Sequence, residues 1–159
     1  MKFTTLITEP KDYSSAALGF YKSLGPVRFG KELAEDINIL VIRLAYKVDK
    51  SWLNSLTNLK YIITPTTGLN HIDLDEAQKR KIKIISLKGH TSFLKNIPST
   101  AEETFGLILA LVRNFPWAFD DVKKGNWNRE IWRGHQLIHK TLGLVGCGRL
   151  GKIMAKYAK

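Results

Sequence analysis

Short apolar runs that alternate with helix-like segments constrain the first half of this chain more than any other feature. Residues 3–7, 37–42, 61–63 and 82–85 have the pattern of strands, and residues 12–24, 48–57 and 73–80 have the pattern of helices. The run at 37–42 is almost continuously apolar, which is typical of a parallel strand buried on both faces. This alternation predicts a parallel sheet covered by helices, so the expected fold class is α/β.

The composition is that of a soluble globular protein. Hydrophobic residues make up 44% of the 159 residues, but no apolar run approaches the roughly 20 residues that a membrane helix needs. We therefore expect no membrane partner. Glu9 and Pro10 interrupt the apolar start of the chain, which is not typical of a secretory signal, so we expect a cytoplasmic protein. The single cysteine, Cys147, excludes an internal disulfide.

The net charge of +11 raises the question of nucleic-acid binding. The cations are scattered, apart from a dense run at residues 79–83. That run ends a predicted helix, where cations favour the helix dipole and face water. We interpret the charge as a solvated face and expect no nucleic-acid partner. A basic nucleic-acid-binding module is the competing interpretation, and it predicts an affinity that falls steeply with salt.

The clearest helix signal lies near the middle of the chain. Ser99 and Glu102 have the spacing of a capping box, which marks a helix N-terminus. Residues 105–112 are apolar almost all round, which predicts a helix buried between two bodies. Pro116 is expected to end this helix. Residues 117–139, which are rich in tryptophan, are expected to wrap over a surface.

Gly146, Gly148 and Gly151 form the pattern G-x-G-x-x-G directly after an apolar run at residues 142–145, which is expected to be a strand. The first glycine permits a tight turn, the second lets a pyrophosphate approach the backbone, and the third lets the next helix pack closely. A helix beginning at Lys152 would offer its N–H groups to phosphates. The context favours a dinucleotide site, with a purely structural turn as the alternative.

Four segments in order resemble those of the D-isomer-specific 2-hydroxyacid dehydrogenases, a family that includes phosphoglycerate dehydrogenases. The family patterns are V-R-S-x-T-K-V-D, G-L-D-N-I-D, N-x-x-S-V-A-E and G-K-T-L-G-I-I-G-L-G-R-I-G. The corresponding segments here are V-I-R with K-V-D (41–43 and 47–49), G-L-N-H-I-D (68–73), N-I-P-S-T-A-E (96–102) and K-T-L-G-L-V-G-C-G-R-L-G (140–151). The resemblance covers the whole chain and corresponds to the N-terminal half of the family.

This resemblance implies both a fold and a function. The fold would be a flavodoxin-like parallel-sheet substrate domain at residues 1–97, a crossing helix at 98–118 and the beginning of a Rossmann dinucleotide-binding domain at 119–159. The intact protein would be an oxidoreductase that transfers hydride between NAD and a small 2-hydroxy or 2-oxo acid, and it would form a homodimer.

The resemblance also implies particular site residues. Backbone N–H groups of Thr66, Thr67 and Gly68 would bind the substrate carboxylate, because successive amides can form a small anion nest. Thr67 would also reach the cofactor. The remaining implied residues are Arg43 and Asn96 for substrate, and Gly146, Gly148, Arg149, Leu150 and Gly151 for the dinucleotide. No metal site is expected.

Each of these substrate residues also has an ordinary structural interpretation. Arg43 could be a surface arginine at a strand end, Thr66 and Thr67 could serve a turn, and Asn96 could cap a helix. The sequence departs from the family pattern at Leu44, where many members have serine. Thr64 and Pro65 stand where phosphoglycerate dehydrogenases carry arginine and alanine. The loss of that cation argues against the same phosphorylated substrate, and an apparent insertion at residues 90–95 could alter specificity further.

The chemistry of hydride transfer is not expected within these 159 residues. Reduction of a 2-oxo acid needs a cation that polarises the carbonyl and an acid, usually histidine held by a carboxylate, that protonates the alkoxide. The resemblance places that arginine, glutamate and histidine in the second half of the cofactor domain. His71, His90, His135 and His139 do not match the catalytic position and are expected at surfaces or caps.

We therefore expect no catalytic residue in this chain and no activity from the chain alone. A non-catalytic dinucleotide-binding protein that controls a partner interface on the same scaffold is the alternative function. The presence of a histidine–glutamate pair in the second half of the cofactor domain would favour the enzyme, and its absence would favour the non-catalytic protein.

Overall fold

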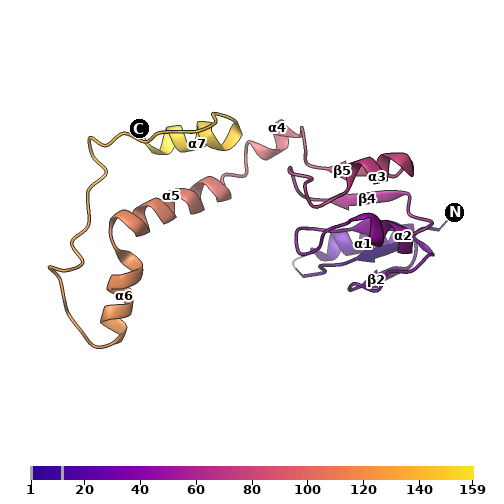
Figure 1. Cartoon of the computed structure of the whole chain (residues 1–159), viewed down its shortest axis with the longest axis horizontal. Coiled ribbons are helices and arrows are strands. Elements are labelled where there is room, and N and C mark those ends of the chain that lie inside the picture. The colour runs from indigo at the N-terminus through magenta and orange to yellow at the C-terminus, as the bar shows by residue number, and fades with distance from the viewer. Residues whose placement is uncertain (1, 12) are drawn as a thin grey trace. The chain divides into compact units, whose positions relative to one another are not determined.

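The parallel sheet expected from the sequence forms in the first of two units of the chain (Figure 1). The computed structural model describes residues 2–11 and 13–159, with one unit reaching to His90 and the other running from Thr91 to Lys159. The sheet has the strand order β2-β1-β3-β4-β5, all pairings are parallel, and its strands are β1 (Thr4–Ile7), β2 (Val27–Phe29), β3 (Ile37–Val41), β4 (Tyr61–Thr64) and β5 (Lys83–Ser86). This confirms the α/β class, and the order is that of flavodoxin-like folds.

Helices cover both faces of this sheet. On one face, α1 (Ser15–Leu24) packs its apolar side chains against Ile7, Ile39 and Val41. On the other face, side chains of α2 (Lys50–Ser55) and α3 (Leu74–Lys79) join a larger core that includes Leu6, Leu40 and Ile62. Since neighbouring residues of a strand point to opposite faces, the nearly continuous apolar run at β3 supplies both cores.

Side-chain caps set the starts of α1, α2 and α3. The Asp49 side chain accepts the N–H of Trp52 at 3.0 Å, and the Asp73 side chain accepts the N–H of Glu76 at 3.0 Å. Ser14 caps α1 in the same way, whereas Asp12, the predicted first residue of that helix, lies outside the described residues. Caps of this kind stabilise a helix by about 1 kcal/mol each.

Arg80, in the dense cationic run, joins the two helices of the larger core. Its guanidinium donates to the carbonyl of Leu53 at 2.5 Å and to the side chain of Asn54 at 2.6 Å, and it also pairs with Glu76 at 2.7 Å. The hydrogen bond from Arg80 lowers the pKa of the Glu76 carboxyl below its ordinary value. One cation of this run therefore has a structural role in the first unit.

The second unit consists of helices and coil. Its helices are α4 (Thr91–Leu94), α5 (Ser99–Val112), α6 (Phe115–Lys123) and α7 (Arg149–Tyr157). None of the described helices is both long and apolar enough to cross a membrane. The predicted capping box is wrong, because Ser99 is already the first helical residue and no side chain caps α5. Pro116 lies in the first turn of α6, a helix the sequence analysis missed, and it follows a break at Asn114 with φ 57°.

The expectation that α5 is buried between two bodies is not met by the described residues. Ala101 is its one buried residue, and the side chains of Leu107 and Leu111 are 64% and 62% exposed. α7 lies against α5, where the rings of Phe105 and Tyr157 meet edge to face at 5.9 Å. The apolar stripe predicted from the sequence exists, but this unit covers only part of it.

The strand expected at residues 142–145 does not form. No described residue of the second unit belongs to a strand, so this segment has no neighbour with which to exchange backbone hydrogen bonds. Val145 is fully exposed. A parallel strand is stable only beside other strands and under covering helices, which explains why an apolar pattern alone does not produce one.

Amide hydrogen exchange tests this contrast between the two units. We expect amides of residues 142–148 to exchange at nearly unfolded rates, because they lack ladder partners, while those of Ile39 and Val41 stay protected by pairing on both sides. Strong protection across residues 142–148 in a monomeric sample would contradict this account of the second unit.

Candidate functional site

The order of the strands reverses between β1 and β3. After β1 the chain crosses to β2 on one side, and after β3 it continues to β4 and β5 on the other. Loops that diverge at the carboxyl ends of parallel strands leave a crevice, which is where open α/β sheets bind ligands. The residues that follow β1 and β3 therefore form the best-supported position for a site.

A pocket of about 780 Å³ opens at this crevice, here called the sheet-edge pocket. It is lined by residues that follow β1, β3 and β4, namely Glu9, Lys11, Tyr13, Arg43, Leu44, Pro65 and Thr66. Arg43 and Thr66 are two of the predicted substrate residues, and the structure brings them to one pocket. Glu9, Lys11 and Tyr13 were missed, because their relevance depends on β1 being next to the reversal, which the sequence pattern did not reveal.

Glu9 ties the loop after β1 to the loop after β3. Its carboxylate accepts the backbone N–H of Arg43 at 2.7 Å and that of Ala45 at 3.2 Å. A charged acceptor makes such bonds roughly twice as strong as bonds between neutral groups. The backbone that carries Arg43 is thus held in place at the rim of the pocket.

The segment from Thr64, the last residue of β4, to Gly68 bends away from the sheet and is here called the threonine turn. The Thr64 and Thr66 hydroxyls lie 3.0 Å apart, and the Thr66 hydroxyl donates to the carbonyl of Gly68 at 2.7 Å. Thr67 and Gly68 are exposed in the same turn. No residue from 66 to 68 has a positive φ, so a bend, not a left-handed residue, sets the direction of these amides.

His71 departs from its predicted surface position. It is only 8% exposed, and its Nε2 lies 3.4 Å from the Thr64 hydroxyl oxygen, while its Nδ1 has no hydrogen-bond partner among the described residues. Burial lowers the pKa of His71 from its ordinary 6.5, and the nearby Glu9 carboxylate partly opposes this shift. A neutral, buried imidazole therefore lies behind the threonine turn.

The glycine motif of the second unit has the local geometry that its pattern implies. Gly146 has φ 94°, a conformation that side chains disfavour. A Cβ on Gly148 would meet nothing within 4 Å, which leaves open space at the N-terminus of α7, and a Cβ on Gly151 would lie 2.5 Å from the Gly146 carbonyl oxygen. The turn, the open approach and the close packing of the helix match the three roles that a dinucleotide loop requires.

Arg149 and Asn96 lie in one region of the second unit. The Arg149 guanidinium donates to the carbonyls of Leu94 at 3.0 Å and Ile97 at 2.8 Å, on either side of the exposed Asn96. The family resemblance implies a role in dinucleotide binding for Arg149. Its side chain contacts the segment before α5, and its backbone begins α7 together with Leu150.

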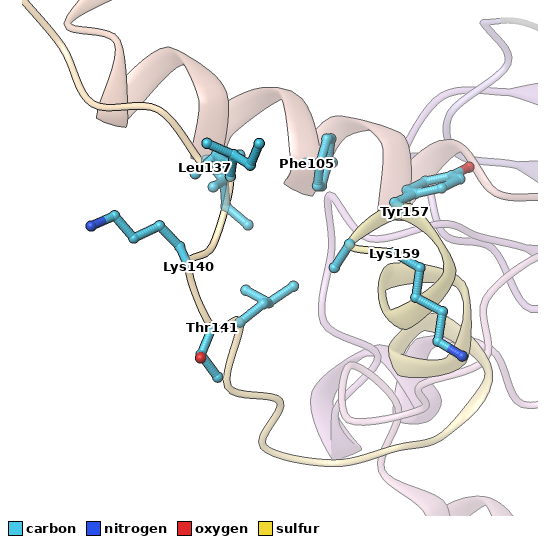
Figure 2. A pocket seen from close by; sticks show the side chains of 10 residues that line it. Phe105, Leu137, Lys140, Thr141, Tyr157 and Lys159 are labelled. Carbon is cyan, nitrogen blue, oxygen red and sulfur yellow. The ribbon is translucent and has the colours of Figure 1, made fainter.

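A second pocket, of about 360 Å³, lies within the second unit and has an apolar lining (Figure 2). Figure 2 shows Phe105 from α5, Tyr157 from α7 and Leu137 from the intervening coil around it. Lys140, Thr141 and Lys159 also line this pocket, beside the apolar and aromatic side chains. Among the described residues, no group of three or more acidic, histidine or cysteine side chains could hold a metal ion.

Comparison with known proteins assigns the chain to a family. Residues 28–93 match the D-isomer specific 2-hydroxyacid dehydrogenase catalytic domain, and residues 105–159 match the NAD binding domain of the same family. Together the two ranges take in well over half of the chain. The chain belongs to the D-isomer specific 2-hydroxyacid dehydrogenase family.

Individual relatives agree with this family. The chain is 39% identical over 120 residues to D-3-phosphoglycerate dehydrogenase of Bacillus subtilis, covering 76% of this chain and 22% of the relative. It is 35% identical over 127 residues to hydroxypyruvate reductase of Thermotoga maritima, covering 80% of this chain and 40% of that one. The chain therefore spans less than half the length of these curated relatives.

A solved structure of D-lactate dehydrogenase from Aquifex aeolicus, complexed with NAD and lactic acid, has the same fold. The TM-score is 0.78 at 25% identity, with 98% of this chain and 47% of that chain covered. Within the family matches, Arg43 and the threonine turn fall in the catalytic domain and the glycine motif falls in the NAD binding domain, whereas Asn96 lies between the two.

The lowered pKa of His71 predicts a pH-dependent stability of the first unit. Because the unfolded state binds the proton more tightly, the free energy of unfolding should fall as pH drops below about 6.5 and level off below the folded-state pKa. Urea denaturation between pH 8 and pH 5 measures this, and His71→Gln should remove that part of the dependence. An identical pH dependence in the variant would show that His71 does not cause it.

Proposed function

We propose that this chain is the substrate domain and the first part of the cofactor domain of an NAD-dependent 2-hydroxyacid dehydrogenase. The intact protein would oxidise the CH–OH group of a small 2-hydroxy acid or run the reverse reduction. The observation that carries this proposal is the sheet-edge pocket at the reversal of strand order, which is lined by Arg43 and by Pro65 and Thr66 of the threonine turn. The family matches support it.

The proposed domain arrangement follows the sequence resemblance. The substrate domain would comprise residues 1–97, the crossing helix residues 98–118 and the cofactor domain the residues from 119. The structure divides the chain after His90, so residues 91–97 of the proposed substrate domain pack with the second unit. The intact protein would work in the cytoplasm as a homodimer.

In this proposal, the substrate carboxylate binds at the threonine turn. The amides of Thr66, Thr67 and Gly68 would donate to its oxygens, and Arg43, which lines the same sheet-edge pocket, would add a charge-assisted bond. Asn96 would hydrogen-bond the substrate from the segment that Arg149 holds. Two classes of donor, one from the backbone and one from a cation, would thus fix the carboxylate and leave the neighbouring carbon free to react.

The glycine motif fits a dinucleotide. Gly146, Gly148 and Gly151 provide the turn and the open approach, and the backbone at Arg149 and Leu150 would hold the pyrophosphate at the N-terminus of α7. Thr67 would reach the same cofactor from the substrate side. When bound, NAD supplies the hydride acceptor or donor for the substrate carbon.

The substrate is proposed to lack a phosphate. Thr64 stands at the position that carries arginine in phosphoglycerate dehydrogenases, and here it is 2% exposed with its hydroxyl engaged by Thr66. A buried threonine offers no cation to a phosphate group. We therefore propose a small 2-hydroxy or 2-oxo monocarboxylate.

Binding of a matched pair of small molecules tests the proposal. Oxamate resembles a 2-oxo monocarboxylate, and oxamide has nearly the same shape without the charge. Calorimetry on residues 1–159 should show oxamate binding with a Kd on the order of 1 mM, or −4 kcal/mol, and no measurable oxamide binding. Equal binding of the two, or no oxamate binding, would remove the carboxylate site.

The same sample should show no turnover of NADH with pyruvate, glyoxylate or hydroxypyruvate. The family resemblance places the arginine, glutamate and histidine of hydride transfer outside the matched segments. Turnover above that of a heat-denatured control would overturn the expectation that residues 1–159 contain no catalytic residue.

A further inference from the structure

We infer that His71 is a positioning residue that orders the threonine turn through a one-directional chain of hydrogen bonds. This inference rests on the proposed function, because the turn is the proposed carboxylate site. His71 itself touches no proposed ligand-binding amide. It would act through the hydroxyls of Thr64 and Thr66.

The direction of this chain of hydrogen bonds follows from the number of hydrogens that each hydroxyl can donate. The carbonyl of Gly68 can only accept, so the single hydroxyl hydrogen of Thr66 is used there, at 2.7 Å. The contact between Thr64 and Thr66 must then use the hydrogen of Thr64. The Thr64 oxygen is therefore an acceptor toward His71, and the ring nitrogen at 3.4 Å must be an Nε2–H. This assigns the tautomer, with the unprotonated nitrogen at Nδ1.

Burial holds the imidazole end of this chain in place. Thr64 and His71 are 2% and 8% exposed. The backbone beside the ring is fixed as well, since the carbonyl of His71 accepts the N–H of Val48 at 2.7 Å and the next residue, Ile72, lies in the larger core. The ring therefore has a fixed anchor, and a buried hydroxyl without its partner would be costly.

The chain of hydrogen bonds ends at the Gly68 carbonyl, in the peptide unit next to the one that carries the Gly68 N–H, a proposed carboxylate donor. The Thr66 hydroxyl donates to the Gly68 carbonyl, and the N–H of Leu87 donates to the Thr66 carbonyl at 3.1 Å. Peptide units are planar, so each bond fixes the orientation of one whole peptide. The peptide that carries the Gly68 N–H lies between these two fixed units, which restricts its rotation before any ligand binds.

Nitrogen NMR of the imidazole tests the assigned tautomer without any ligand. At pH 8, a two-dimensional spectrum that correlates the two ring nitrogens of His71 with the carbon-bound ring hydrogens should show that Nε2 is protonated and Nδ1 is not. The opposite tautomer would overturn the inference, whatever the chain binds.

Variants test the positioning role. His71→Leu removes the donor, Thr64→Val removes the middle hydroxyl with nearly the same shape, and His71→Gln retains an N–H donor. The backbone order parameter at Gly68 should fall from about 0.85 to below about 0.6 in the first two variants and recover in His71→Gln. Ile82→Val, a change in the same core away from the turn, is the matched control for lost stability and should leave Gly68 ordered.

Oxamate affinity gives the functional readout. Loss of one hydrogen bond's contribution should weaken binding about three- to tenfold in His71→Leu and Thr64→Val, with partial recovery in His71→Gln. If wild-type chain binds no oxamate but the tautomer and order parameters follow expectation, the proposed function fails and the positioning role stands. An ordered Gly68 in Thr64→Val would overturn the positioning role even if His71→Leu does not fold.

Discussion

Parallel pairing between β1 and β3 is the interaction on which the candidate site depends. The register places Ile7 opposite Val41, and the N–H of Thr8 continues the ladder to the Val41 carbonyl at 3.1 Å. The next residue, Glu9, therefore reaches the backbone of Arg43. Because the chain leaves these two strands in opposite directions, no helix connection fills the space between them, and the sheet-edge pocket opens there.

Local signals in the sequence predicted a large part of the first unit. The strands β1, β3, β4 and β5 and the helices α1, α2 and α3 depend on residues a few positions apart, which a pattern can show. Strand β2 has only three residues and a partly exposed sequence, so it gave no signal. The capping box at Ser99 failed because Pro98, not Ser99, is the N-cap residue of α5; it has φ −87° and ψ −5°, and its carbonyl accepts the first helical N–H groups. Spacing alone does not say at which residue a helix starts.

The site was predictable only where the family resemblance provided residues. Arg43 and Thr66 were named in that way, and the structure places them together. Glu9 and His71 were missed because their roles depend on contacts with distant segments. Glu9 bonds residues more than 30 positions away, and the burial of His71 depends on the end of β4. The resemblance alone supports the roles of Asn96, Thr67 and Leu150 in binding.

The second unit shows what an apolar pattern cannot provide by itself. Residues 142–145 have the composition of a buried strand, and α5 has the composition of a buried helix, but both expose apolar surface within the described residues. Each pattern predicts a face that needs a partner. The first unit contains the partners of its own strands, so its predictions were confirmed, whereas the second unit contains no described strand to pair with residues 142–145.

The central claim is that a carboxylate binds at the threonine turn in the sheet-edge pocket. Mapping of backbone amide shifts in residues 1–159 during titration with oxamate tests it most directly. The account predicts the largest shifts at Thr66, Thr67, Gly68 and Arg43, with loss of these shifts in Gly68→Pro, which removes one donor from the turn. Shifts confined to the apolar pocket at Phe105 and Tyr157, or unchanged binding in Gly68→Pro, would contradict it.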